Sequence, residues 1–226
     1  MIGSRGMILP ATAGISLGIT AFAADALPGL IGELLNPTIS SVLPWAGTAL
    51  ALGYWARSAS HAAISSVSSL ALAVTTYYLL TSAGSRRWEV GMAEDGGSSA
   101  FAGLSSVARA ITFWLIASAL AGAAIGLLGH VIARGSIYRR SLASGIAVGI
   151  IGSESWYNSL VILPQWGNDW YRMASWPVLA LFAVAGVTAM AARARVSWSV
   201  AVPAGIVALG LTTAIWSQIH IVRSVL

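Results

Sequence analysis

Charged residues divide this chain into long apolar stretches. Six stretches without a charged residue are 19 to 28 residues long, at positions 6–24, 34–56, 58–85, 110–133, 173–192 and 196–222. A helix needs about 20 apolar residues to cross about 30 Å of hydrocarbon. A seventh stretch, 141–168, contains a single charge, Glu154. We therefore predict an all-α, polytopic membrane bundle of about seven transmembrane helices that forms one domain over residues 1–226.

The positions of the arginines predict the orientation of the bundle. The predicted loops place seven arginines on one side of the membrane: Arg5, Arg57, Arg134, Arg139, Arg140, Arg193 and Arg195. Loops rich in Arg and Lys face the cytoplasm. We expect a cytoplasmic N-terminus and a multi-pass protein of the cell inner membrane. The apolar run 6–24 is longer than the core of a usual signal peptide, so we expect it to be retained.

A weak threefold repetition follows the first predicted helix. Three helical hairpins each begin near an outer tryptophan, at Trp45, Trp114 or Trp176, and turn at the inner arginines. Interfacial tryptophans and inner arginines also recur in polytopic proteins that have no repeat. Glycines four residues apart predict close helix contacts. These pairs are Gly14 and Gly18, Gly122 and Gly126, and Gly145 and Gly149.

Composition agrees with the pattern and excludes several functions. The chain is 57% hydrophobic and 8% charged, and its net charge of +5 arises from arginines without any lysine. Because the arginines are dispersed over the ends of apolar stretches, they form no basic face for nucleic acid. Cysteine is absent, and His61, His130 and His220 have no metal-site spacing. We expect no metal, no cofactor and no nucleic-acid partner.

Glu154 is the main candidate for chemistry. At about 1.5 Å of rise per residue it lies roughly 20 Å from the arginine-rich side, inside the membrane. A carboxyl group there faces the bundle interior or a hydrated cavity, or is protonated. Helical spacing places Tyr157 and Asn158 on its face and Trp156 on another. Glu154 is either a ligand-binding or catalytic group, or a structural carboxylate that locks the bundle.

Asp25 is a second candidate catalytic acid, at the outer end of the first predicted helix before Pro28 and Gly29. An exposed loop acid is the alternative interpretation. Several aromatic residues lie near the same outer level and are candidate ligand-binding residues together with Asn158. They are Tyr77, Tyr78, Trp156, Tyr157 and Trp216. An acid beside aromatic rings suits an organic cation, and also the protonation of an alkene. Most of these rings would equally suit an interfacial aromatic belt.

Several enzyme classes lack their sequence signatures. The chain has no His-Glu-x-x-His motif, no paired acidic motif for a magnesium-bound diphosphate and no glycine-rich phosphate loop. The segment Gly152–Ser155 lacks the second glycine of a hydrolase nucleophile elbow. The sequence leaves open whether the protein is an enzyme.

Four features stand out along the chain: Trp45 opening a span that runs through Gly53 to Arg57, the pair Tyr77 and Tyr78, the series Gly122, Gly126 and Gly129, and Glu154 followed by Tyr157. In these features the chain resembles an uncharacterised family of small multi-spanning membrane proteins common in actinobacteria. The resemblance implies a membrane bundle and carries no activity. A looser analogy, based on size, span count and chemistry, connects the chain with seven-span membrane terpene cyclases.

Three functional hypotheses follow. The first is a membrane-embedded binding or transport protein for a small hydrophobic or cationic molecule, with Glu154 as the proton-coupled or charge-pairing residue. The second is a membrane-bound isoprenoid (terpene) cyclase in which Glu154 or Asp25 is the general acid. The third is an accessory subunit that packs against another membrane protein. All three place the chain in a lipid bilayer.

Overall fold

Helices make up all the regular structure in the described residues, which are 5–85, 99–162 and 170–223 of a computed structural model. They are α1 (Arg5–Ala26), α2 (Gly29–Ile39), α3 (Val42–Trp55), α4 (Ala59–Ser85), α5 (Ser99–Arg134), α6 (Ile137–Tyr157), the π-helix η1 (Asn158–Ile162), α7 (Trp170–Arg193) and α8 (Trp198–Arg223). The all-α prediction is confirmed for these residues.

Five helices are long and apolar enough to cross a membrane. They are α1, α4, α5, α7 and α8, and their apolar segments are Ile8–Ala26, Ala59–Gly84, Gly103–Arg134, Trp176–Arg193 and Trp198–Ile219. These helices support a multi-pass protein in a lipid bilayer. Helix α3 has 14 residues, which is short of the about 20 needed for a crossing. Helix α6 is not among the five. It contains many Ser and Gly residues besides Arg139, Arg140 and Glu154.

The predicted continuous helix over 34–56 is wrong, because the chain breaks between α2 and α3. Ser40 follows the last residue of α2, and Ser41 is extended, with ψ at 165°. Pro44, in the first turn of α3, suits the break. It has no N–H to donate to the Ser40 carbonyl, and its ring would collide with that carbonyl in a continuous helix, whereas the first turn of a new helix accepts it.

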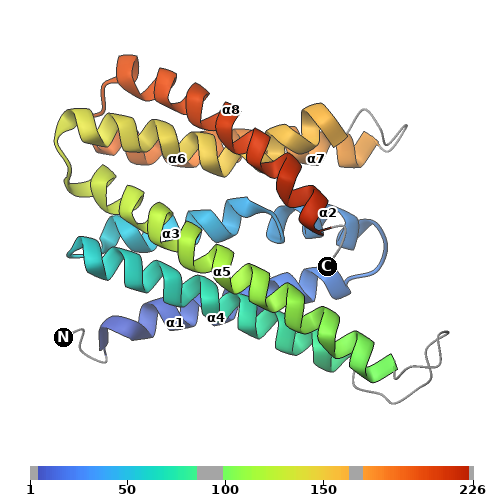
Figure 1. Ribbon diagram of the computed structural model, residues 1–226. Helices are drawn as coiled ribbons and strands as arrows, with labels where there is room; N and C mark the ends of the chain where they lie inside the picture. The colour runs from blue at the N-terminus through green and yellow to red at the C-terminus, as the bar shows by residue number, and fades with distance from the viewer. Residues whose placement is uncertain (1–4, 86–98, 163–169, 224–226) are drawn as a thin grey trace.

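The helices form two groups. Helices α1, α3, α4 and α5 pack together, and α6 packs against both α7 and α8. Contacts of α6 with α5 and α3, and of α7 with α2, join the groups. Figure 1 shows that the axes of the long helices are roughly parallel, and that the turns α3–α4, α5–α6 and α7–α8 lie at one end.

Glycines bring the backbones of neighbouring helices into contact. A Cβ added at Gly14 or Gly18 of α1 would collide with the α4 backbone, one at Gly126 of α5 with the α4 carbonyl of Ala62, and one at Gly145 of α6 with the α8 carbonyl of Ala201. The predicted glycine pairs therefore lie at helix contacts. Small residues allow this approach where lipid provides no hydrophobic drive for helix association.

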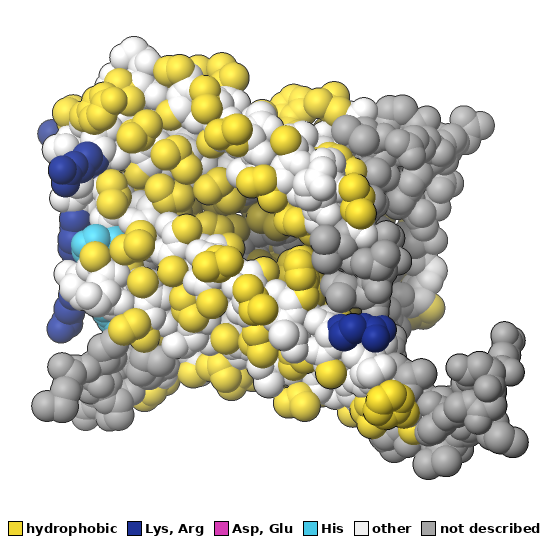
Figure 2. Space-filling model, in the orientation of Figure 1, with side chains coloured by type: hydrophobic (Ala, Val, Ile, Leu, Met, Phe, Trp, Pro, Cys, Tyr) yellow, Lys and Arg dark blue, Asp and Glu magenta, His cyan; other side chains and the backbone are white. Residues whose placement is uncertain are grey.

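Basic side chains gather at the end where the three turns lie. Figure 2 shows most of the visible basic side chains there and a mainly hydrophobic surface beside them. Several contact helix-end carbonyls: Arg134 donates to Tyr54, and Arg140 donates to Gly135 and Ala194. Cations are favourable at helix C-termini because the last carbonyls there lack backbone partners.

Candidate functional site

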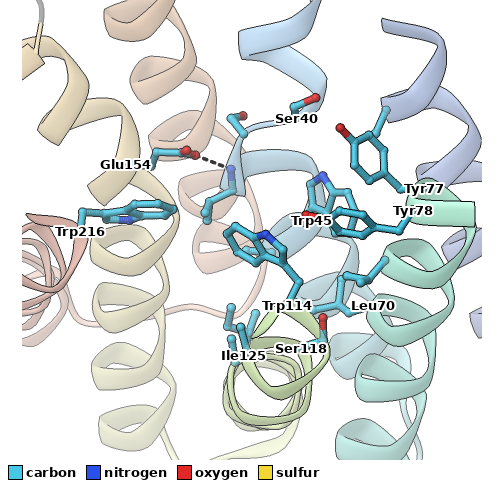
Figure 3. A pocket seen from close by; sticks show the side chains of 17 residues that line it. Ser40, Trp45, Leu70, Tyr77, Tyr78, Trp114, Ser118, Ile125, Glu154 and Trp216 are labelled. Carbon is cyan, nitrogen blue, oxygen red and sulfur yellow. Dashed lines mark hydrogen bonds between the residues drawn. The ribbon is translucent and has the colours of Figure 1, made fainter. Parts of the chain in front are cut away.

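A cavity of about 220 Å³ lies where the two helix groups meet. It is bordered by α1, the α2–α3 break, α3, α4, α5, α6 and α8. Five aromatic side chains line it: Trp45, Tyr77, Tyr78, Trp114 and Trp216. Figure 3 shows Glu154 and Trp216 on one side of the cavity and Tyr77 and Tyr78 on the other.

The carboxylate of Glu154 borders this cavity and caps a helix of the other group. Glu154 is only 7% exposed, and its Oε2 accepts a hydrogen bond from the backbone N–H of Val42 at 2.5 Å. Val42 is the first residue of α3, and the Ser41 side chain does not cap that helix. The Ser41 hydroxyl instead donates to Thr38 in α2. Glu154 therefore satisfies one of the N–H groups that the start of a helix leaves without a partner, at its positive end.

A second carboxylate holds the other side of the α2–α3 break. Asp25 of α1 accepts hydrogen bonds from the hydroxyls of Ser40 and Tyr77. Trp45 adds a bond across the break, since its indole N–H donates to the Ile39 carbonyl at 3.1 Å. Ser40, Tyr77 and Trp45 all line the cavity. The break is therefore fixed by Asp25 on the α2 side and by Glu154 on the α3 side.

Helix α6 changes its geometry just after Glu154. The segment Asn158–Ile162 is a π-helix, and the Asn158 side chain donates from Nδ2 to the Glu154 carbonyl at 2.9 Å. Just before Glu154, the Ser153 hydroxyl accepts a hydrogen bond from Trp216 Nε1 at 3.1 Å. This bond holds the Trp216 ring of α8 against α6 beside the cavity.

The structure brings some of the candidate residues together and leaves others apart. Glu154, Tyr77, Tyr78 and Trp216 line the cavity. Asp25 is exposed and lies next to the cavity, hydrogen-bonded to the lining residues Tyr77 and Ser40.

The remaining candidates on α6 and η1 do not line this cavity. Tyr157 is buried, Trp156 is 40% exposed, and Asn158 uses its side chain on the Glu154 carbonyl. Trp156 lies two positions after Glu154, so an α-helix turns it about 200° away from that residue. Their proposed role in ligand binding stays a prediction.

Several cavity residues had no functional role in the sequence analysis. Trp45 and Trp114 are predicted starts of hairpins, Trp45 is also part of the family resemblance, and Ser40, Ser41 and Val42 carry no prediction. The i−4 rule for proline fits a break at Ser40, but other prolines of the chain lie inside helices, so Pro44 alone does not predict it. The sequence offers no comparable signal for the bond from Val42 to Glu154, which joins residues 112 positions apart.

In the described part of the chain, no group of three or more His, Asp or Glu residues is placed to hold a metal ion. The arrangement instead combines carboxylate groups, hydroxyl groups and aromatic faces around an apolar space. Such a site can hold an apolar or cationic molecule, because aromatic faces attract cations and also pack against hydrocarbon.

Comparison with known proteins places the chain in a family without indicating an activity. Residues 3–219 match the Family of unknown function (DUF6518). No curated protein and no solved structure matches the chain. The match spans nearly the whole sequence, and the chain therefore belongs to the Family of unknown function (DUF6518).

Proposed function

We propose that this protein is a membrane-embedded binding or transport protein for a small hydrophobic or cationic molecule. One observation carries the proposal: the buried carboxylate of Glu154 and five aromatic side chains border the same cavity of about 220 Å³. Glu154 is the residue that pairs with the ligand's charged or hydrogen-bonding group. The aromatic rings surround the apolar part of the ligand.

The lining of the cavity supports this ligand chemistry. None of its 17 residues is Lys, Arg or His, and the polar ones other than the aromatic residues are Ser40, Ser41, Ser118 and Glu154. A cavity of 150 Å³ holds a benzene molecule, so one of this size holds a group of roughly ten non-hydrogen atoms. A single aromatic amine matches both the volume and the combination of carboxylate and aromatic faces.

The broken helix supports coupling of ligand binding to a conformational change. Transporters often place their substrate site where a membrane helix is interrupted and the helix ends face the cavity. Here the carboxylate that meets the ligand is also the acceptor for the first N–H of α3. When Glu154 pairs with a cationic ligand or takes up a proton, its bond to Val42 weakens, and α3 is free to shift relative to α6.

The same arrangement supports seven crossings with a cytoplasmic N-terminus. The 21 residues of α6 alone extend about 32 Å at a rise of about 1.5 Å per residue, enough to cross about 30 Å of hydrocarbon. Helices α2 and α3 form the other additional crossing, interrupted at Ser40. The arginines at the α3–α4, α5–α6 and α7–α8 turns mark the cytoplasmic side, and the membrane is then the cell inner membrane.

Photolabelling tests the proposal. The protein is placed in phosphatidylcholine nanodiscs and irradiated with benzylamine that carries an unsubstituted diazirine ring, which keeps the probe close to the size of the cavity, and labelled residues are mapped by mass spectrometry. We expect labels on cavity residues such as Trp114 and Trp216, suppressed by excess benzylamine. Glu154→Gln removes the charge but keeps a side-chain carbonyl oxygen for Val42, and it lowers cavity labelling at least tenfold.

The matched control is Phe182→Leu, on a residue that is 65% exposed on α7 and outside the cavity. This variant keeps the cavity labelling of the unmodified protein. Equal labelling of the cavity in Glu154→Gln, or labelling that excess benzylamine does not suppress, contradicts a ligand site at Glu154.

A second candidate function is favoured by the position of Asp25. Its carboxylate accepts a hydrogen bond from the Tyr77 hydroxyl, and Tyr77 lines the cavity, so one hydroxyl group connects Asp25 with a ligand in the cavity. An isoprenoid cyclase with Asp25 or Glu154 as general acid predicts a cyclised product from a polyprenyl substrate, absent in Asp25→Asn. A binding or transport protein returns its ligand unchanged.

The hypothesis of an accessory subunit predicts a different result, in which a stable membrane partner is purified together with the protein.

A further inference from the structure

The cavity reaches the surface of the protein beside the middle of α5. Ala121 lines the cavity and is also exposed. The neighbouring surface of α5 is apolar, because Leu120 is 71% and Ile116 is 58% exposed. Across from α5, α8 packs on α6 and has no extended contact with α5 among the described residues. Figure 2 shows this face hollowed between α5 and the α6–α8 pair.

The position of this opening along the helices places it in the hydrocarbon of a bilayer. Arg134 ends α5 at the arginine-rich end, and Ala121 precedes it by 13 residues. At about 1.5 Å per residue, Ala121 lies about 20 Å along the helix from that end, within a hydrocarbon layer of about 30 Å. Lipid chains, rather than water, therefore meet the cavity at this point.

The cavity also reaches the surface at its polar end. Ser40, at the α2–α3 break, lines the cavity and is exposed, and it is hydrogen-bonded to Asp25. The two openings differ in chemistry, since hydroxyl and carboxyl groups lie at one and alanine, leucine and isoleucine at the other. A molecule that fills both environments has a polar head and an apolar chain.

We propose that the ligand is a single-chain amphiphile that enters from the bilayer, with its polar or cationic head at Glu154 and its apolar chain leaving through the opening at Ala121 between α5 and α8. This inference rests on the proposed function and specifies the ligand class. A long chain cannot fit inside the cavity and must leave it. A space for roughly ten non-hydrogen atoms holds the head and the first carbons of a twelve-carbon chain, so the remainder lies among lipid chains.

The experiment compares two photoreactive amines in the same phosphatidylcholine nanodiscs. One is the short diazirine benzylamine, and the other is dodecylamine with a diazirine in its chain. Ala121→Phe narrows the opening, and Leu120→Phe is the control one position away on the lipid-facing surface of α5. The readout is the ratio of cavity labelling by dodecylamine to cavity labelling by benzylamine. Thermal unfolding of each variant checks that it is folded.

We expect Ala121→Phe to lower this ratio at least fivefold and Leu120→Phe to leave it within twofold. In the unmodified protein, dodecylamine should also label residues beside the opening, such as Ile116. A ratio unchanged in Ala121→Phe overturns entry from the bilayer while the ligand site at Glu154 stands. Absence of cavity labelling by benzylamine in the unmodified protein overturns both, and this result separates the two proposals.

Discussion

Helix α6 contacts its neighbours in two different ways along its length. In its first part, Gly145 and Gly149 allow the α8 backbone to lie directly against α6. In its last part, Ser153 binds the indole of Trp216 and Glu154 binds the first N–H of α3. In the first region the helices touch because glycine has no side chain to separate them. In the second region two specific side-chain hydrogen bonds hold the helices next to a cavity.

These two kinds of contact differ in how easily they can rearrange. A glycine contact has no rotamer that could rearrange, so it fixes the distance between two backbones. A carboxylate or an indole can exchange one partner for another without disturbing the backbone. The glycine region therefore acts as the fixed frame, and the region around Glu154 is where binding a ligand can alter the structure.

The largest expected effect comes from adding one methyl group to the glycine region. Gly145→Ala places a Cβ against the carbonyl oxygen of Ala201 and forces α6 and α8 apart. We expect a loss of stability at the upper end of about 1–3 kcal/mol. Thermal unfolding in detergent, followed by circular dichroism, measures it.

The control is Gly210→Ala on α8, the helix that Gly145 contacts, because a Cβ at Gly210 meets nothing within 4 Å. It should raise stability by about 0.5–1 kcal/mol through helix propensity alone. Similar shifts in both variants would mean that the glycine contact does not fix the two helices.

An intermediate effect is expected where Glu154 binds α3. Glu154→Leu leaves the half-buried Val42 N–H without this acceptor. We expect a cost at the lower end of the about 1–3 kcal/mol for an unsatisfied buried donor. Glu154→Gln keeps an acceptor oxygen and should lose less stability. Hydrogen exchange gives the specific readout, since amides in the first turn of α3 should exchange faster in the leucine variant than in the glutamine variant. Equal exchange at Val42 in both would show that Glu154 does not cap α3.

The smallest effect is expected at Trp216. Trp216→Phe removes the hydrogen bond to Ser153, worth about 0.5–1.5 kcal/mol, while keeping an aromatic ring. Trp198→Phe is the matched control, because that ring is 48% exposed near the start of α8. A double-mutant cycle of Trp216→Phe with Ser153→Ala should show non-additive stabilities. Additive losses would mean that the two side chains act independently.

The apolar helices could be predicted from the sequence because long stretches without charge have few alternatives to membrane crossing. The glycine spacing also located helix contacts, since residues four apart share a helix face. Counting charges could not detect the break at Ser40, because the break does not depend on polarity. Proline positions do not identify it either, since Pro10, Pro37, Pro177 and Pro203 all lie inside helices.

The site was only partly accessible to sequence reasoning. An acid within an apolar stretch indicates an interior position, and Glu154 is buried beside the cavity. The partners of Asp25 and Glu154 depend on how the helices pack, so neither the Tyr77 hydroxyl nor the Val42 N–H could be assigned beforehand. The positions of Trp45 and Trp114 in the cavity lining also depend on helix packing, and the sequence pattern predicts only their places at the starts of hairpins.

The polarity of α6 has a consequence for how the protein is made. In the proposed seven-crossing arrangement, this helix brings Glu154 into the membrane with many serines and glycines, while Arg139 and Arg140 stay at its cytoplasmic end. A charged residue at the centre of an inserting helix is unfavourable by about 2.5–3.5 kcal/mol. Helix α6 is therefore poorly suited to pass from the insertion machinery into the bilayer without another helix beside it. We expect its stable insertion during synthesis to wait until α8, more than forty residues later, emerges to cover Gly145 and Gly149.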